Sequence, residues 1–164
     1  MIIKDAMVLI HLAKITVLKK SCDFFKKVTI PEEVYNEIKR GEEKGYEDAH
    51  VIEELITMRK IEVKQVKKKE LLDKARYYNI QRGEAEAVAL YWEERADYLA
   101  TDDDNIRKKA ILLDIKILGT PSIIVSLFKN KLISRQKYYE SINELKKIGW
   151  FNSQVIDKMR QEAA

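Results

Sequence analysis

Short apolar stretches alternate with segments of helical periodicity along nearly the whole chain. The first stretch, 1–4, precedes a segment at 7–18 in which apolar side chains recur every three or four residues. Strands that alternate with helical segments are typical of βαβ units, in which the strands form a parallel sheet and helices cover its faces. The alternation therefore predicts one α/β domain around a central parallel sheet.

The same pattern assigns the remaining elements. Strands are expected at 1–4, 27–30, 61–63, 97–101 and 115–118, with helices at 7–18, 31–40, 46–58, 67–78, about twelve residues after Gly83, 106–114, 121–130, 134–147 and 152–159. Pro31 is expected in the first turn of its helix and Gly41 at its end, as these residue types prefer. We expect a single domain over 1–164, in which 133–164 is a C-terminal helical extension packed on the rest.

Composition narrows the possible functions. The 164 residues are 46% hydrophobic and 35% charged, which describes a compact globular domain and not a disordered or collagen-like chain. No apolar run approaches the roughly 20 residues of a membrane span, and the amino terminus lacks the features of a secretory signal. A cytoplasmic location without a membrane partner is therefore expected. Cys22 has no second cysteine to pair with, so any metal must bind oxygen ligands.

Acidic residues follow two of the predicted strands. Asp5 comes directly after the first strand, and Asp102, Asp103 and Asp104 follow the strand that ends at Thr101. Ligands of open parallel sheets bind beyond the carboxyl ends of the strands, so these acids converge if the two strands are neighbours. An Asp at such a position also caps a helix by accepting hydrogen bonds from its first amides. Taken singly, each Asp is explained at least as well by capping.

Two glutamates on predicted helices are further candidates. Glu84 begins an inward-facing row that continues with Ala87, Val88 and Tyr91. Its carboxylate is satisfied either by the amino end of its own helix or by a ligand. Glu37 lies at the edge of the apolar stripe of an earlier helix, and alone it is explained better as a surface acid.

Five segments resemble the successive blocks of a PIN domain and occur in the order of that family. The most specific are the GEAEA helix at 83–87 and the Thr-Asp-Asp stretch that leads to Arg107. The resemblance is closest to the prokaryotic and archaeal PIN proteins related to VapC toxins. The five segments are KDAMVLIHLAKI (4–15), IPEEVYNEI (30–38), RGEAEAVALYW (82–92), YLATDDDNIRKKA (98–110) and ILGTPSIIVSLFKNKLIS (117–134).

The resemblance implies a three-layer α/β/α PIN-like domain with a central parallel sheet and additional C-terminal helices. It makes four acids catalytic, namely Asp5, Glu37, Glu84 and Asp103. Asp5, Glu84 and Asp103 are the implied metal ligands, whereas Glu37 holds or polarises the attacking water. The choice of Asp103 rests on the basic residue four positions later, and its neighbours Asp102 and Asp104 stay open as alternatives.

Substrate-binding residues are expected near these acids. Thr101 matches the hydroxyl that the family carries at the strand end, and Arg107 and Lys108 are candidates for contacts with RNA phosphates. Met7 stands where many family members have Ser or Thr. The chain's net charge of +4 permits a nucleic-acid partner without requiring one. Further basic candidates, which are equally typical of a solvated helix face, are Lys109, Lys129, Lys131, Arg135 and Lys137.

The implied function is an endoribonuclease that hydrolyses RNA phosphodiester bonds with Mg²⁺ or Mn²⁺, as the toxin of a type II toxin–antitoxin pair. The resemblance also implies a homodimer and a cognate antitoxin protein. Four neighbouring carboxylates repel one another unless cations neutralise them. Mg²⁺ and Mn²⁺ prefer such oxygen ligands, and a pair of these ions can activate water and stabilise the leaving oxygen.

Two alternatives belong to other functional classes. A non-catalytic PIN-like module that binds RNA or protein is favoured by Met7, which removes a hydroxyl from the expected site. A phospho-acceptor receiver domain also places Asp residues after parallel strands. That fold needs an acidic pair after its first strand, where this chain has only Asp5, so the receiver domain ranks lowest.

Overall fold

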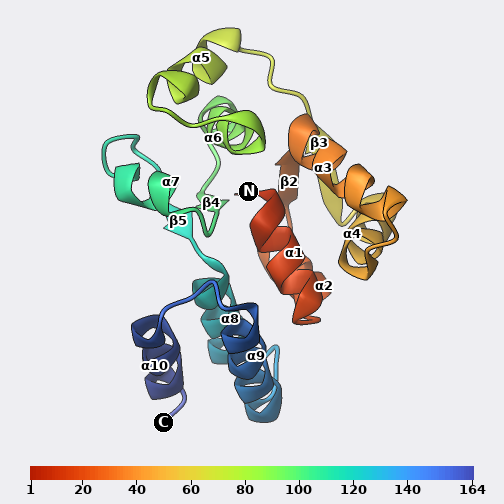
Figure 1. The fold of residues 1–164 in the computed structure, drawn as a ribbon, viewed down its shortest axis with the longest axis vertical. Helices are drawn as coiled ribbons and strands as arrows, with labels where there is room; N and C mark the ends of the chain where they lie inside the picture. Colours follow the sequence, from red (N-terminus) through yellow and green to blue (C-terminus); the bar gives the residue numbers. More distant parts are fainter.

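The computed structural model describes residues 1–164 and contains one five-stranded sheet in which all strands are parallel (Figure 1). The strand order is β3-β2-β1-β4-β5, so the chain builds one half of the sheet outward from β1 and then returns to the other side of β1. The strands are β1 (Ile2–Lys4), β2 (Val28–Pro31), β3 (Ile61–Lys64), β4 (Tyr98–Ala100) and β5 (Ile117–Leu118).

Ten helices surround this sheet. The helices are α1 (Ala6–Lys14), α2 (Leu18–Phe25), α3 (Glu32–Glu43), α4 (Glu47–Thr57), α5 (Lys69–Tyr77), α6 (Arg82–Glu94), α7 (Asp104–Lys109), α8 (Thr120–Lys129), α9 (Arg135–Ile148) and α10 (Ser153–Glu162). None of them has both the length and the apolar character that a membrane crossing requires.

A buried apolar core lies on each face of the sheet. Ile2 joins the larger core, which includes residues of α1 to α4 and α8 to α10. Ile3, the next residue of β1, joins the smaller core with Leu99 and residues of α5 and α6. Successive strand residues point to opposite faces, and burial on both faces is typical of parallel sheets. The predicted three-layer α/β/α fold with C-terminal helices is therefore confirmed.

The first helical segment differs from the expectation of one helix over 7–18. α1 ends at Lys14, Thr16 adopts a left-handed backbone with φ of 65°, and α2 starts at Leu18. The Val17 amide closes the turn by donating to the Leu12 carbonyl at 3.0 Å. This reversal keeps Val17 and Leu18 buried in the larger core. The continuous apolar periodicity of the segment concealed the break, and α2 was not predicted.

The second predicted helix was also wrong at both of its ends. Pro31 is the last residue of β2 and precedes α3, and α3 continues through Gly41 to Glu43. A Cβ atom at Gly41 would lie 3.1 Å from the Cβ of Ala49 on α4. The glycine therefore permits α3 and α4 to pack closely and does not end the helix. α7 is shorter than predicted, since it ends at Lys109 and is followed by turns.

The two tail helices pack beside α8. Figure 1 shows α8, α9 and α10 together at the end of the molecule that carries the carboxyl terminus. Tyr138 of α9 is fully buried, stacks on Phe128 of α8 with ring centroids 4.4 Å apart, and donates a 2.6 Å hydrogen bond to the Met159 carbonyl of α10. One side chain thus connects all three helices.

Candidate active site

Asp5 lies at the carboxyl end of β1, at the position where the strand order reverses. Its amide donates to the Ala100 carbonyl of neighbouring β4 at 3.0 Å. Its carboxylate caps α1 by accepting a 2.9 Å hydrogen bond from the Val8 amide. The position beside β4 explains why acids from two distant parts of the sequence can meet here.

Burial raises the pKa of the Asp5 carboxyl to about 7. Hydrogen bonds from the Thr101 hydroxyl and the Val8 amide lower this pKa, whereas the nearby charges of Asp102 and Glu84 raise it. Removal from water disfavours the charged form of an acid, and a like charge disfavours it further. The protein therefore holds Asp5 in surroundings where a cation would stabilise its ionised form.

Glu37 and Glu84 meet Asp5 around one small cavity of about 30 Å³. Glu84 lies in the first turn of α6, and Glu37 approaches it from α3. A Cβ atom at Gly83 would lie 2.6 Å from Oε1 of Glu37, so the glycine provides the room for this carboxylate. Met7 also lines the cavity. The space corresponds to about one or two water molecules, which is room for a small ligand among three carboxylates.

The pKa values of Glu37 and Glu84 are both raised, and burial is the largest cause for each. The charges of Asp103 and Glu37 raise the pKa of Glu84 further, and that of Glu33 raises the pKa of Glu37. Arg82 lowers both pKa values. Acids with such perturbed pKa values gather at functional sites, where burial and like charges are arranged to shift them.

Asp103 approaches the same region from the end of β4. Its carboxylate caps α7 by accepting a 2.8 Å hydrogen bond from the Ile106 amide, and its own amide donates to Thr101 Oγ1 at 3.1 Å. Thr101 also lowers the pKa of Asp5, so it lies near both acids. The structure thus gathers Asp5, Glu37 and Glu84 around one cavity and places Asp103 within electrostatic reach of Glu84.

The donor chemistry of this cluster matches a hard divalent cation, because Asp5, Glu37 and Glu84 offer carboxylate oxygens. In the present side-chain arrangement, no three His, Cys, Asp or Glu residues form a group that could hold a metal ion. Asp5 and Asp103 each direct a carboxylate oxygen to a helix amide. The residue types therefore suit a divalent metal ion. The side chains must rotate before three of them can coordinate it.

Asp102, one alternative to Asp103 as a metal ligand, has its carboxylate held by other side chains and amides. Its Oδ2 lies 2.8 Å from His11 Nδ1 and accepts a 2.5 Å hydrogen bond from the Thr120 hydroxyl, and its Oδ1 accepts from the Thr120 amide at 2.7 Å. The carboxylate is fully buried and joins α1 to the start of α8. Asp104, the other alternative, lies exposed on the first turn of α7.

Some of the predicted phosphate-binding side chains have no hydrogen-bond or ion-pair partner in the protein, and others do. Arg107 and Lys108 are exposed on α7, and neither takes part in an ion pair. Arg107 borders a groove formed with α8 and α10. Lys131 is also exposed. The remaining candidates have internal partners: Lys109 donates to the Tyr78 carbonyl, Arg135 to the Ala163 carbonyl and Lys137 to the Thr16 hydroxyl, and Lys129 pairs with Glu162.

Two arginines near the acids were missed from the sequence. Arg40 and Arg82 border a wider, wholly polar cavity that adjoins the first one and shares Glu37 and Glu84 with it. Arg82 adopts a left-handed backbone with φ of 54°, which is uncommon for a residue other than glycine. The Arg-Gly pair directly before Glu84 is the signal that could have indicated this residue.

Comparison with known proteins gives one match. A family model described as a PIN domain matches residues 1–164. No curated protein and no solved structure shows significant similarity to the chain.

Proposed function

The chain belongs to the PIN-domain family, and on this premise we propose that it is a metal-dependent endoribonuclease that hydrolyses RNA phosphodiester bonds. PIN domains are generally nucleases and typically use divalent metals. The observation that carries the proposal is the cavity that Asp5, Glu37 and Glu84 share, with the pKa of each acid raised. Neighbouring carboxylates of this kind destabilise the folded protein by repulsion, so their presence indicates a functional role.

We assign Asp5, Glu84 and Asp103 as the metal ligands. When bound, Mg²⁺ or Mn²⁺ lowers the pKa of the attacking water and offsets the charge that develops on the phosphate. Thr101 positions Asp103, because its hydroxyl accepts from the Asp103 amide, and it lowers the pKa of Asp5. Glu37 is the general base, since a carboxylate with a raised pKa is better matched to proton transfer near neutral pH.

Arg82 complements these acids on the substrate side. It borders the cavity next to Glu84 and lowers the pKa values of Glu37 and Glu84 through its charge. A guanidinium at this place can bind a non-bridging phosphate oxygen. It would thereby compensate for the repulsion between the RNA and the carboxylates.

A non-catalytic PIN-like module that binds RNA or protein is the second candidate. It is favoured by Met7, which lines the cavity where many family members carry a hydroxyl, and by the lack of a preformed group of three metal-holding side chains. Isothermal titration with Mn²⁺ separates the two candidates. A nuclease binds the ion and loses this binding in Asp103→Asn, whereas a non-catalytic module does not bind it.

The biological setting is proposed from the resemblance to the VapC-related branch. We propose that the chain is the toxin of a type II toxin–antitoxin pair, that it forms a homodimer, and that it acts on RNA in the cytoplasm as one PIN-like domain with 133–164 as its extension. Induced expression in a bacterial host tests the toxin role. Growth arrest by the wild type and normal growth with Asp103→Asn are expected, whereas unimpaired growth with the wild type contradicts it.

Cleavage of a labelled single-stranded RNA tests the proposed activity. The purified chain should cut it with Mg²⁺ or Mn²⁺ and not with EDTA. Asp103→Asn should reduce the rate by about 100-fold or more, since removal of a group essential to the transition state costs at least about 3 kcal/mol. Asp104→Asn is the matched control, because it removes the same charge one residue away at an exposed position. Equal rates for the two variants would refute the assignment.

A further inference from the structure

A groove between two C-terminal helices has no role in the chemistry described above. Its volume is about 390 Å³, which lies in the range of small-ligand sites. α8 contributes Ser122, Val125, Ser126 and Lys129, and α10 contributes Val155, Lys158, Met159 and Glu162. Both sets follow the i, i+3, i+4, i+7 spacing of a single helix face, so the groove lies between two facing helices.

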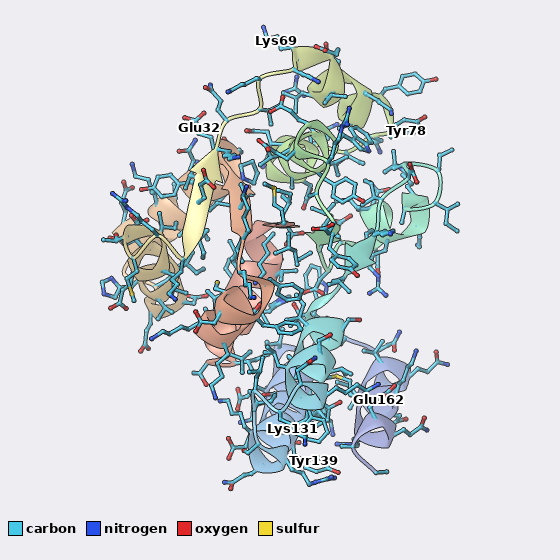
Figure 2. The ribbon with its side chains drawn as sticks, turned by 180° about the vertical axis from the view of Figure 1, so that it is seen from behind. Glu32, Lys69, Tyr78, Lys131, Tyr139 and Glu162 are labelled. Atoms are coloured by element: carbon cyan, nitrogen blue, oxygen red, sulfur yellow. The ribbon has the colours of Figure 1, made fainter.

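The cationic side chains of the groove differ in whether they form an ion pair. At one end Lys129 of α8 pairs with Glu162 of α10 at 2.6 Å, and Figure 2 labels Glu162 on α10. Arg107 and Lys158 also border the groove, and neither forms an ion pair. The groove therefore carries two cations that form no ion pair, together with the Ser122 hydroxyl and the apolar side chains of Val125, Val155 and Met159.

The Arg107 end of the groove lies on the helix that Asp103 caps. Arg107 lies on α7, one turn after Asp103, which caps that helix. Gly119, which also lines the groove, is so close to the Asp102 loop that a Cβ atom there would lie 3.1 Å from Asp102 Oδ1. The groove therefore lies beside the loop that carries Asp102 and Asp103.

We propose that this α7–α8–α10 groove binds the RNA strand next to the cleaved phosphodiester bond. Arg107 and Lys158 contact successive phosphates, and the apolar side chains of Val125, Val155 and Met159 support one base. Single-stranded nucleic acid is bound by this combination of a cationic path with an apolar surface for the bases. The inference rests on the proposed ribonuclease function, because it names the binding site for that substrate.

Binding of a fluorescent single-stranded RNA of about 12 nucleotides, measured with EDTA present, tests the groove without requiring cleavage. Lys158→Glu should raise the Kd about tenfold, and the slope of log Kd against log salt should fall by about 0.7 for one lost phosphate contact. Arg160→Glu is the matched control. It makes the same charge change two residues away, at an exposed position of α10 that does not line the groove, and it should change the Kd less than about twofold.

Two further measurements locate the RNA directly. Ser122→Trp, which fills the groove from an exposed position, should weaken binding without lowering the melting temperature. RNA that contains 4-thiouridine should crosslink under ultraviolet light to peptides of α8 or α10. Equal effects of Lys158→Glu and Arg160→Glu, or crosslinks confined to other elements, would overturn the proposal.

The outcomes distinguish this proposal from the one on which it rests. If RNA is bound in the groove but is never cut with Mg²⁺ or Mn²⁺, the ribonuclease assignment fails and the binding site stands. If RNA is cut and Lys158→Glu binds like the wild type, the groove assignment fails and the ribonuclease stands. A chain that does not bind RNA at all contradicts both.

Discussion

Replacement of Gly83 by alanine should separate activity from stability. Gly83 lies in the first turn of α6, directly before Glu84. An added Cβ atom would lie 2.6 Å from Oε1 of Glu37 and 3.4 Å from a methyl group of Val34. The second distance is an ordinary contact, so the conflict is confined to the Glu37 carboxylate.

The size of the effect follows from this geometry. To restore normal contact, the carboxylate must move by roughly 0.5–1 Å, which costs little because it ends a flexible side chain. Alanine in place of glycine favours a helix by up to about 1 kcal/mol, so the free energy of unfolding should be unchanged or slightly higher. A displacement of about 1 Å in catalytic geometry can cost on the order of 100-fold in rate.

Thermal unfolding and metal-dependent RNA cleavage, measured on the same preparation, test this prediction. Gly83→Ala should melt at or above the wild-type temperature and cut RNA about 10- to 100-fold more slowly. Gly41→Ala is the matched control on α3, since its added Cβ would lie 3.1 Å from Ala49 Cβ and within 4 Å of no carboxylate. Wild-type activity in Gly83→Ala would refute the role of Glu37. A large fall in the melting temperature of this variant would show that altered packing, and not placement of the carboxylate, explains any loss of activity.

Three further predictions concern the buried polar groups. Because the pKa of Asp5 rises from 3.8 to about 7 on folding, the metal-free protein should lose stability as the pH rises from about 4 to about 7; melting curves should show a smaller loss for Asp5→Asn, and an equal loss would contradict the burial argument. His11→Ala should lower the free energy of unfolding by about 3 kcal/mol in urea titrations, since it removes a partner of the buried Asp102 carboxylate; a change below about 1 kcal/mol would show that water replaces it. Tyr138→Phe should cost about 1 kcal/mol by loss of the bond to Met159, and hydrogen exchange should show α10 protected less than α1; uniform loss of protection would contradict a local role.

The sequence predicted the sheet and the place of the acids because both depend on local signals. Short apolar strands alternate with amphipathic helices, and Asp5 and Asp103 follow the strands that become neighbours as β1 and β4. The family match confirms the PIN-domain resemblance over the whole chain. The assignment of roles to the individual acids stays a prediction.

Features that depend on packing between distant elements were not predicted. The break at Thr16 and the passage of α3 through Gly41 have their causes in tertiary contacts and not in local propensity. The same holds for Asp102: three adjacent Asp residues look equivalent in sequence, and only the positions of His11 and Thr120 show that this one is tied internally. Arg40 and Arg82 follow Glu37 and precede Glu84 closely in sequence, but they were missed because only the folded chain brings both arginines to one cavity with these acids.

Anomalous diffraction from crystals soaked in Mn²⁺ tests the central claim most directly. At least one manganese peak is expected, coordinated by Asp5, Glu84 and Asp103, with Asp5 and Asp103 rotated from their present helix-capping positions. No peak is expected in Asp103→Asn crystals. A site without manganese at saturating concentration, or a peak bound by other residues only, would contradict the account.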